Sequence, residues 1–114
     1  MENTMSDVKK QALFFALVTA IEGGSNYWCC DIDFITKDYN SISLETFCDR
    51  TEPTDSIICW NEYDESFSVT REEFISRVTY WIPEWIALFS SSEFDAIHAD
   101  NFLQHGMLND IIYG

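Results

Sequence analysis

The chain has 114 residues, of which twenty are Asp or Glu and only six are Lys or Arg, so its net charge at neutral pH is −14. A surface this acidic repels nucleic acid and anionic membranes, which excludes both as direct partners, and attracts the basic protein surfaces that bind nucleic acid. With 46% hydrophobic and 16% aromatic residues, the chain also has the apolar side chains that disordered acidic tails lack. We therefore expect one compact acidic domain over residues 1–114.

A nearly all-apolar helix is predicted near the N-terminus. Apolar residues recur at helical spacing from Val8 to Glu22. Gly23-Gly24 should end this helix, because glycine readily adopts the left-handed conformation found at many helix termini. Residues 27–35 then alternate between apolar and polar side chains, which predicts a half-buried strand with Asp31 and Asp33 on its solvent side. Because the helix is apolar almost all round, we expect it to lie at the centre of the fold.

The middle of the chain reads as strands and turns. Residues 42–48 are predicted as a short strand and residues 56–63 as a longer one, with a loop over 49–55 between them. A tight acidic turn at Asp64-Glu65 leads into a further strand around residues 67–69, which completes a hairpin.

The last third of the chain is predicted to be helical. Thr70 with Glu73 three residues later forms a capping box, and Pro83 should kink or divide the helix that follows. A final helix is expected over residues 94–105, with an interruption at Gly106 and one more turn near the C-terminus. The order of elements predicts an α+β fold, an antiparallel β-meander of three to four strands packed with an N-terminal helix and C-terminal helices.

The acidic residues are concentrated between residues 45 and 73, which hold nine acids against two arginines. A folded chain of this mass exposes about 6,400 Å², so evenly spread charges would lie about one per 460 Å². Duplex DNA carries about one per 100 Å², and mimicry of DNA would therefore require clustering. We predict that seven of these acids bind the partner: Glu45, Asp49, Glu52, Asp55, Glu62, Asp64 and Glu65.

No motif in the sequence indicates catalysis, a cofactor or a bound metal. His98 and His105 with Asp95 supply too few ligands for a typical metal site, although a small enzyme that uses either histidine stays open as the least favoured reading. The sequence that starts at Asp31-x-Asp33 lacks the Gly and Glu of a calcium loop. The four cysteines show no C-x-x-C spacing, and we expect free thiols.

Aromatic side chains offer a second kind of contact surface. The spacing of Trp28 and Trp81 favours the core for both, whereas Tyr63 and Trp85 fit either the core or an exposed interface. An assembly or regulatory protein that acts through such aromatic contacts, including a homo-oligomer, is the alternative to an acidic binding surface.

Two segments of the chain resemble a family of small, mostly uncharacterised bacteriophage and prophage proteins. The first runs from Glu22 to Trp28 and carries an E-G-G-x-x-Y-W signature; the second comprises Ala99-Asp100, Gln104 and the terminal Tyr113-Gly114. Asn109 departs from the Gly that is usual in that family. The resemblance implies a phage origin without an established chemistry.

The hypothesis that joins these observations is a phage-derived anti-defence inhibitor of the anti-CRISPR type. Such a protein would bind the basic surface of a CRISPR effector, restriction enzyme or polymerase and block its access to nucleic acid. The sequence shows no apolar run of about 18 residues and no signal peptide, so we expect it in the cytoplasm of a bacterial host.

Overall fold

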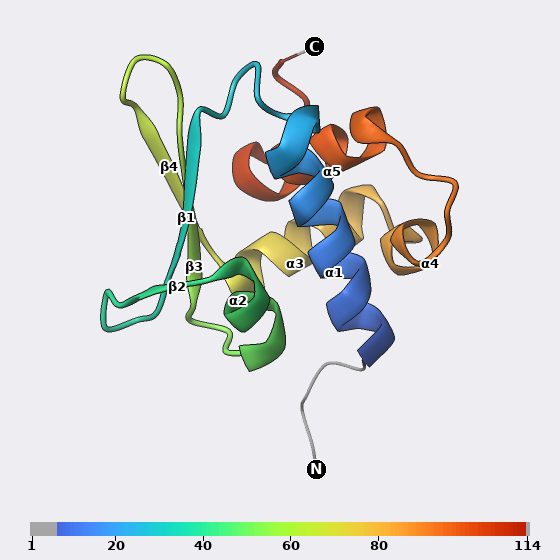
Figure 1. The fold of residues 1–114 in the computed structure, drawn as a ribbon, viewed down its shortest axis with the longest axis horizontal. Helices are drawn as coiled ribbons and strands as arrows, with labels where there is room; N and C mark the ends of the chain where they lie inside the picture. The colour runs from blue at the N-terminus through green and yellow to red at the C-terminus, as the bar shows by residue number, and fades with distance from the viewer. Residues whose placement is uncertain (1–6, 114) are drawn as a thin grey trace.

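Four antiparallel strands form one sheet, and the helices lie on one side of it (Figure 1). The computed structural model describes residues 7–113. The sheet order is β2-β1-β3-β4, with the strands β1 (Asp31–Ile35), β2 (Ser41–Ile42), β3 (Ser56–Trp60) and β4 (Ser66–Thr70). This architecture confirms the predicted α+β fold with an antiparallel sheet, an N-terminal helix and C-terminal helices.

The two faces of the sheet have different environments because side chains alternate along each strand. The face toward the helices carries Phe34 from β1, Ile57 and Cys59 from β3, and Val69 from β4, all of them buried. The strand register places Asp31, Trp60 and Ser66 in one row of the opposite face. The helix-facing side of the sheet therefore belongs to the core, and the other side is left open.

Helix α1 (Asp7–Thr19) lies at the centre of the helical layer, as its composition predicts. Ala12, Leu13, Ala16 and Leu17 are completely buried, and the helix packs against α2, α4 and α5. It continues as a π-helical turn, η1 (Ala20–Gly24). A Cβ atom on Gly24 would lie 2.7 Å from the carbonyl oxygen of Ala96, so the close approach of η1 to the start of α5 requires glycine there.

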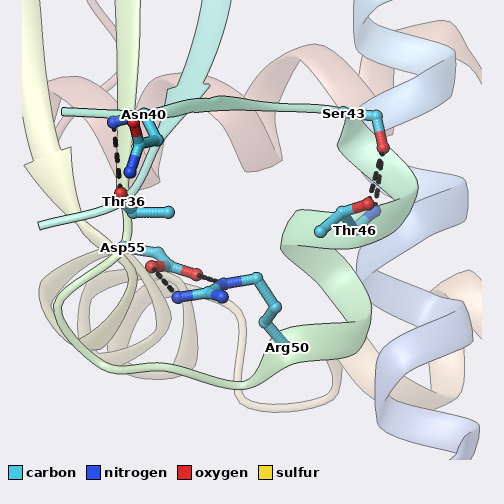
Figure 2. Close-up of polar contacts among 6 residues, drawn as sticks. All are labelled: Thr36, Asn40, Ser43, Thr46, Arg50 and Asp55. Atoms are coloured by element: carbon cyan, nitrogen blue, oxygen red, sulfur yellow. Dashed lines mark hydrogen bonds and ion pairs between the residues drawn. The ribbon is translucent and has the colours of Figure 1, made fainter. Parts of the chain in front are cut away.

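The segment predicted as a strand over residues 42–48 is a helix for most of its length, so that prediction is wrong beyond Ile42. Helix α2 runs over Leu44–Arg50, and Ser43 caps it by accepting a hydrogen bond from the Thr46 N–H at 3.1 Å (Figure 2). Apolar residues at Leu44, Phe47 and Cys48 have i, i+3, i+4 spacing. A seven-residue segment is short enough for this pattern to pass for a buried strand.

The C-terminal helices follow most of the predicted boundaries. Helix α3 (Arg71–Trp81) is capped by the Thr70 hydroxyl, which accepts from the Glu73 N–H at 3.2 Å. Pro83 separates α3 from α4 (Trp85–Ser90), which is the division expected where a backbone donor is missing.

Helix α5 (Ala96–Leu108) continues through Gly106, where an interruption was predicted. Gly106 stays in the helix because the Phe74 ring occupies the place of a side chain: an added Cβ would lie 2.1 Å from Phe74 Cε2. The helix ends instead at Asn109, whose φ of 61° lies in the left-handed region that glycine and asparagine tolerate best. The residues that follow do not form the further helical turn predicted for them.

We expect Gly106→Ala to lower the free energy of unfolding by about 1–3 kcal/mol, because the new methyl group must displace a packed ring. Urea unfolding followed by tryptophan fluorescence measures this loss. Adding Phe74→Leu to Gly106→Ala should recover part of it, since the smaller side chain makes room. Additive losses in the double variant would contradict the proposed contact.

Candidate protein-binding surface

The seven acids predicted to bind a partner fall into three places in the structure. Glu45 and Asp49 lie on α2 and Glu52 in the loop after it, all exposed. Glu62, Asp64 and Glu65 lie in the turn between β3 and β4, also exposed. Since β3 spans five residues, about 17 Å, the two groups sit at opposite ends of the strand and do not form one patch (Figure 1).

Asp55 is the exception among the seven, because its side chain is completely buried. Its two carboxylate oxygens accept hydrogen bonds from Arg50 Nε at 2.7 Å and Arg50 Nη2 at 3.1 Å (Figure 2). Its main-chain oxygen also accepts from the Arg71 N–H at 2.6 Å. Asp55 therefore fixes the loop between α2 and β3, and we do not include it in a binding surface.

The turn between β3 and β4 holds its acids in a defined geometry. The Asn61 side-chain oxygen accepts hydrogen bonds from the Tyr63 N–H at 2.9 Å and the Glu65 N–H at 3.0 Å. Asp64 has a φ of 62°, which matches the left-handed position of a three-residue hairpin loop. The turn thus presents Glu62, Tyr63 and Asp64 outward at the end of the sheet.

The strand pairing brings two further carboxylates toward this turn. Asp31 pairs with Trp60 and Asp33 with Ile58, and both acids are exposed on the side of the sheet away from the helices. We call this surface the open sheet face: Asp31, Asp33, Ile58, Trp60, Ser66 and Ser68, together with the turn residues Glu62, Tyr63, Asp64 and Glu65. The alternating sequence already places Asp31 and Asp33 in solvent, but only the sheet order shows that they adjoin the turn.

The charge of the open sheet face is high for its size. β1, β3, β4 and the connecting turn contain five acids and no Lys or Arg. From strand rise and spacing this face covers about 350 Å², or about one carboxylate per 70 Å². Duplex DNA carries about one charge per 100 Å². The density of acidic residues on the open sheet face is therefore much higher than the mean charge density of the whole surface.

Aromatic side chains divide between the core and the surface. Trp28 and Trp85 are buried, whereas Tyr63 is 76% exposed among the acids of the turn. Trp81 is 43% exposed and its ring stacks on His105 at 4.9 Å, so its prediction as a core residue is wrong. Tyr63 and the half-buried Trp60 are the aromatic groups that the open sheet face offers to a partner.

The segment around Glu22–Trp28 and the segments around Asp100 and Tyr113 meet at a buried carboxylate. Asp100 Oδ1 accepts hydrogen bonds from Ser25 Oγ and Trp28 Nε1, each at 2.7 Å. Asp100 Oδ2 accepts from the Tyr27 hydroxyl at 2.5 Å and from Gln104 Nε2 at 3.0 Å. Burial and the adjacent Asp100 carboxylate raise the pKa of Tyr27 to about 12, which keeps its hydroxyl protonated as a donor.

Gln104 extends this network to the C-terminal segment. Its side-chain oxygen accepts from the N–H groups of Ile112 and Tyr113, both at 2.8 Å, and its nitrogen donates to the Tyr113 carbonyl at 2.9 Å. The Tyr113 ring stacks on Trp28 with 5.2 Å between centroids. The sequence presents these residues as two separate motifs, and the structure makes them one hydrogen-bonded unit.

The histidines take part in local structure. His98 Nδ1 accepts a hydrogen bond from the Asp95 N–H at 3.1 Å, and the Asp95 carboxylate accepts one from the His98 N–H at 3.0 Å. The two residues thus form the capping box of α5. Burial lowers the pKa of His105. Within residues 7–113, no group of three or more His, Cys, Asp or Glu side chains is placed to hold a metal ion.

Together these features define an α+β protein with a helical layer on one side of its sheet and an acidic open face on the other. Comparisons of the chain with protein-family models, with curated proteins and with solved structures find no match. Among the described residues, no helix has both the length and the apolar character needed to cross a bilayer.

The hydrogen bonds of Tyr27 lead to a stability prediction. We expect Tyr27→Phe to lower the free energy of unfolding by about 1–2 kcal/mol, because Asp100 and Gln104 each lose a partly buried hydrogen bond to the Tyr27 hydroxyl. Tyr63→Phe is the matched control, since it removes a hydroxyl from an exposed ring and should change stability by less than about 0.5 kcal/mol. Equal effects in urea unfolding would show that the Tyr27 hydroxyl contributes nothing to the network.

Proposed function

We propose that this chain is a non-catalytic inhibitor that binds a basic protein surface through its open sheet face. The observation that supports this most directly is the group of five carboxylates on a surface that no described helix covers and that contains no Lys or Arg. A field of one sign on a small, rigid surface attracts a partner of opposite charge and orients its approach.

The most concrete form of the proposal is a phage-borne anti-defence protein of the anti-CRISPR type. Its target would be a CRISPR effector, a restriction enzyme or a polymerase in a bacterial cell, whose Lys and Arg side chains hold nucleic acid by its phosphates. Carboxylates at a density close to that of phosphates on DNA would occupy those side chains in place of the nucleic acid. The resemblance to phage proteins and the high net charge both favour this class of target.

The open sheet face also offers apolar contacts that charge alone does not supply. Trp60 and Ile58 lie between Asp31 and Asp33 on one side and the serines of β4 on the other. An apolar centre with a polar rim is the usual composition of a protein interface, and aromatic residues often dominate its binding energy. We expect the carboxylates to determine the association rate and the aromatic residues to slow dissociation.

The first experiment is affinity purification of the tagged chain from bacterial cells at low and at high salt, followed by identification of bound proteins. A CRISPR, restriction or polymerase complex that is lost at high salt should then be tested for competition between the chain and nucleic acid. A salt-resistant partner, or recovery of the chain alone, would contradict this proposal and favour the aromatic assembly or regulatory alternative.

Two charge-matched triple variants test which surface binds the target. In the first, Asp31→Asn, Asp33→Asn and Glu62→Gln remove three acids from the open sheet face. In the second, Glu45→Gln, Glu52→Gln and Glu72→Gln remove three exposed acids near the opposite end of β3. We expect the first variant to lose affinity about tenfold or more and to show a shallower salt dependence, with little change in the second.

The comparison separates a specific surface from net charge, because both variants lose the same number of acids. Equal losses would show that only the total charge matters. A loss confined to the second variant would move the binding surface to α2, the loop after it and the start of α3.

A further inference from the structure

A pocket of 490 Å³ lies between η1, the start of α5 and the C-terminal segment. The residues that line it include the aromatic Tyr27 and Tyr113, the apolar Ile97 and Ile111, and the polar Asp100 and Asn101. None of these residues belongs to the open sheet face, so the pocket is a separate feature of the molecule. Its volume is in the range of small-molecule sites, and its walls are mostly apolar.

The charge of Asp100 is not balanced by a cation among the partners that the structure shows. The side chain is only 7% exposed, and its two oxygens accept four hydrogen bonds, all of them from the neutral side chains of Ser25, Tyr27, Trp28 and Gln104. In these four bonds both Asp100 oxygens act as acceptors, as the oxygens of a carboxylate do. Buried charges in proteins are normally paired with an opposite charge.

Three further acids are neighbours in the sequence of residues that line the pocket. Glu22, Asp95 and Asp110 are exposed and directly adjoin the lining residues Gly23, Ala96 and Ile111 in the chain. The segments that build the pocket, residues 20–35 and 93–113, contain no Lys or Arg. The pocket therefore has a negative potential above an apolar, aromatic wall.

These properties together select the chemistry of a ligand. A cation placed against the faces of aromatic rings is attracted by their quadrupoles, more strongly where water is excluded. A hydrated metal ion would not use the apolar wall, and an anion would be repelled by Asp100 and the neighbouring acids. A ligand with a cationic group and an apolar body could contact both Asp100 and the apolar and aromatic residues of the lining.

We propose that this pocket binds an organic cation, a guanidinium or ammonium group carried on an apolar or aromatic body. The cation would lie near Asp100 and the two tyrosine rings, with its apolar body against Ile97 and Ile111. The source of such a group is either an Arg or Lys side chain of a partner protein or a free small amine. The inference does not rest on the function proposed for the open sheet face.

Benzylamine and phenylguanidine are suitable probes, with benzyl alcohol as the neutral match of nearly the same shape. Titrations followed by NMR chemical shifts, or by the fluorescence of Trp28 beneath Tyr113, report binding at this site. We expect both cations to bind about tenfold or more tightly than benzyl alcohol. Equal affinities for the cations and the alcohol, or no binding of either cation, would overturn the proposal.

Two lysine substitutions locate the binding site. Ile97→Lys places a positive charge in the lining at a side chain that is 70% exposed, so the protein should fold and lose cation binding. Ile112→Lys adds the same charge at a 62% exposed side chain that does not line the pocket, and should retain most of the binding. An equal loss in both variants would mean that net charge, not the pocket, attracts the probe.

A last comparison distinguishes the two sources of the cation. If a capped peptide with arginine between two alanines binds about tenfold more tightly than N-acetylarginine amide, the pocket receives a side chain of a partner protein. If the two bind alike, the pocket takes a free small cation. The triple variant of the open sheet face should bind benzylamine normally, so failure of either proposal can be recognised independently of the other.

Discussion

The buried carboxylate of Asp100 holds together three parts of the chain that are distant in sequence. Ser25, Tyr27 and Trp28 reach it from the segment between η1 and β1, while Gln104 reaches it from the next turn of α5 and carries the C-terminal segment. Each donor offsets part of the free-energy cost of burying the Asp100 side chain. Removing one donor leaves an Asp100 oxygen with fewer hydrogen bonds, which also weakens the contribution of the other donors. The direction in which the chain enters β1 therefore depends on α5.

The helical layer covers only one face of the sheet, and this constraint determines what the other face can be. Phe34, Ile57 and Val69 contact the helices, so the intervening positions of the same strands must meet water or a partner. Most of those positions are acidic or small and polar. Ile35, Ile58 and Trp60 are the exceptions, and the carboxylates of β1 lie directly beside Ile58 and Trp60. The same alternation that builds the core thus produces a surface with an apolar centre and charged edges.

Elements with a strong local signal could be predicted from the sequence, and those that depend on distant contacts could not. The apolar α1, the alternation of β1, the Thr70 cap and the break at Pro83 each follow from neighbouring residues. Gly106 has the same local signal as a helix terminus, and only the Phe74 ring, 32 positions earlier in the chain, explains why the helix continues. Nothing in the local sequence distinguishes Asp55 from an exposed loop acid, and only the structure shows that it is buried and paired with Arg50. Asp31 and Asp33 could be placed in solvent, but their position beside the β3–β4 turn depends on the pairing of β1 with β3.

The uneven charge of the surface arises from where the cations lie as much as from where the acids lie. Arg50 pairs with the buried Asp55, Lys10 with Asp49 at 3.3 Å, and Arg77 with Glu73 at 3.0 Å, while Arg71 lies over the Phe47 ring at 4.3 Å. Lys37, the remaining cation of the strand region, follows β1 in the turn to β2, beyond the end of the strand away from the acidic turn. Five of the six cations therefore belong to α1, α2 and α3 and act within the helical side of the molecule. If the same number of acids were accompanied by evenly distributed Lys and Arg residues, the electrostatic field at the surface would be weaker. Here the open sheet face keeps its charge uncompensated, and that charge, rather than the acidity of the whole chain, is what a basic partner would meet.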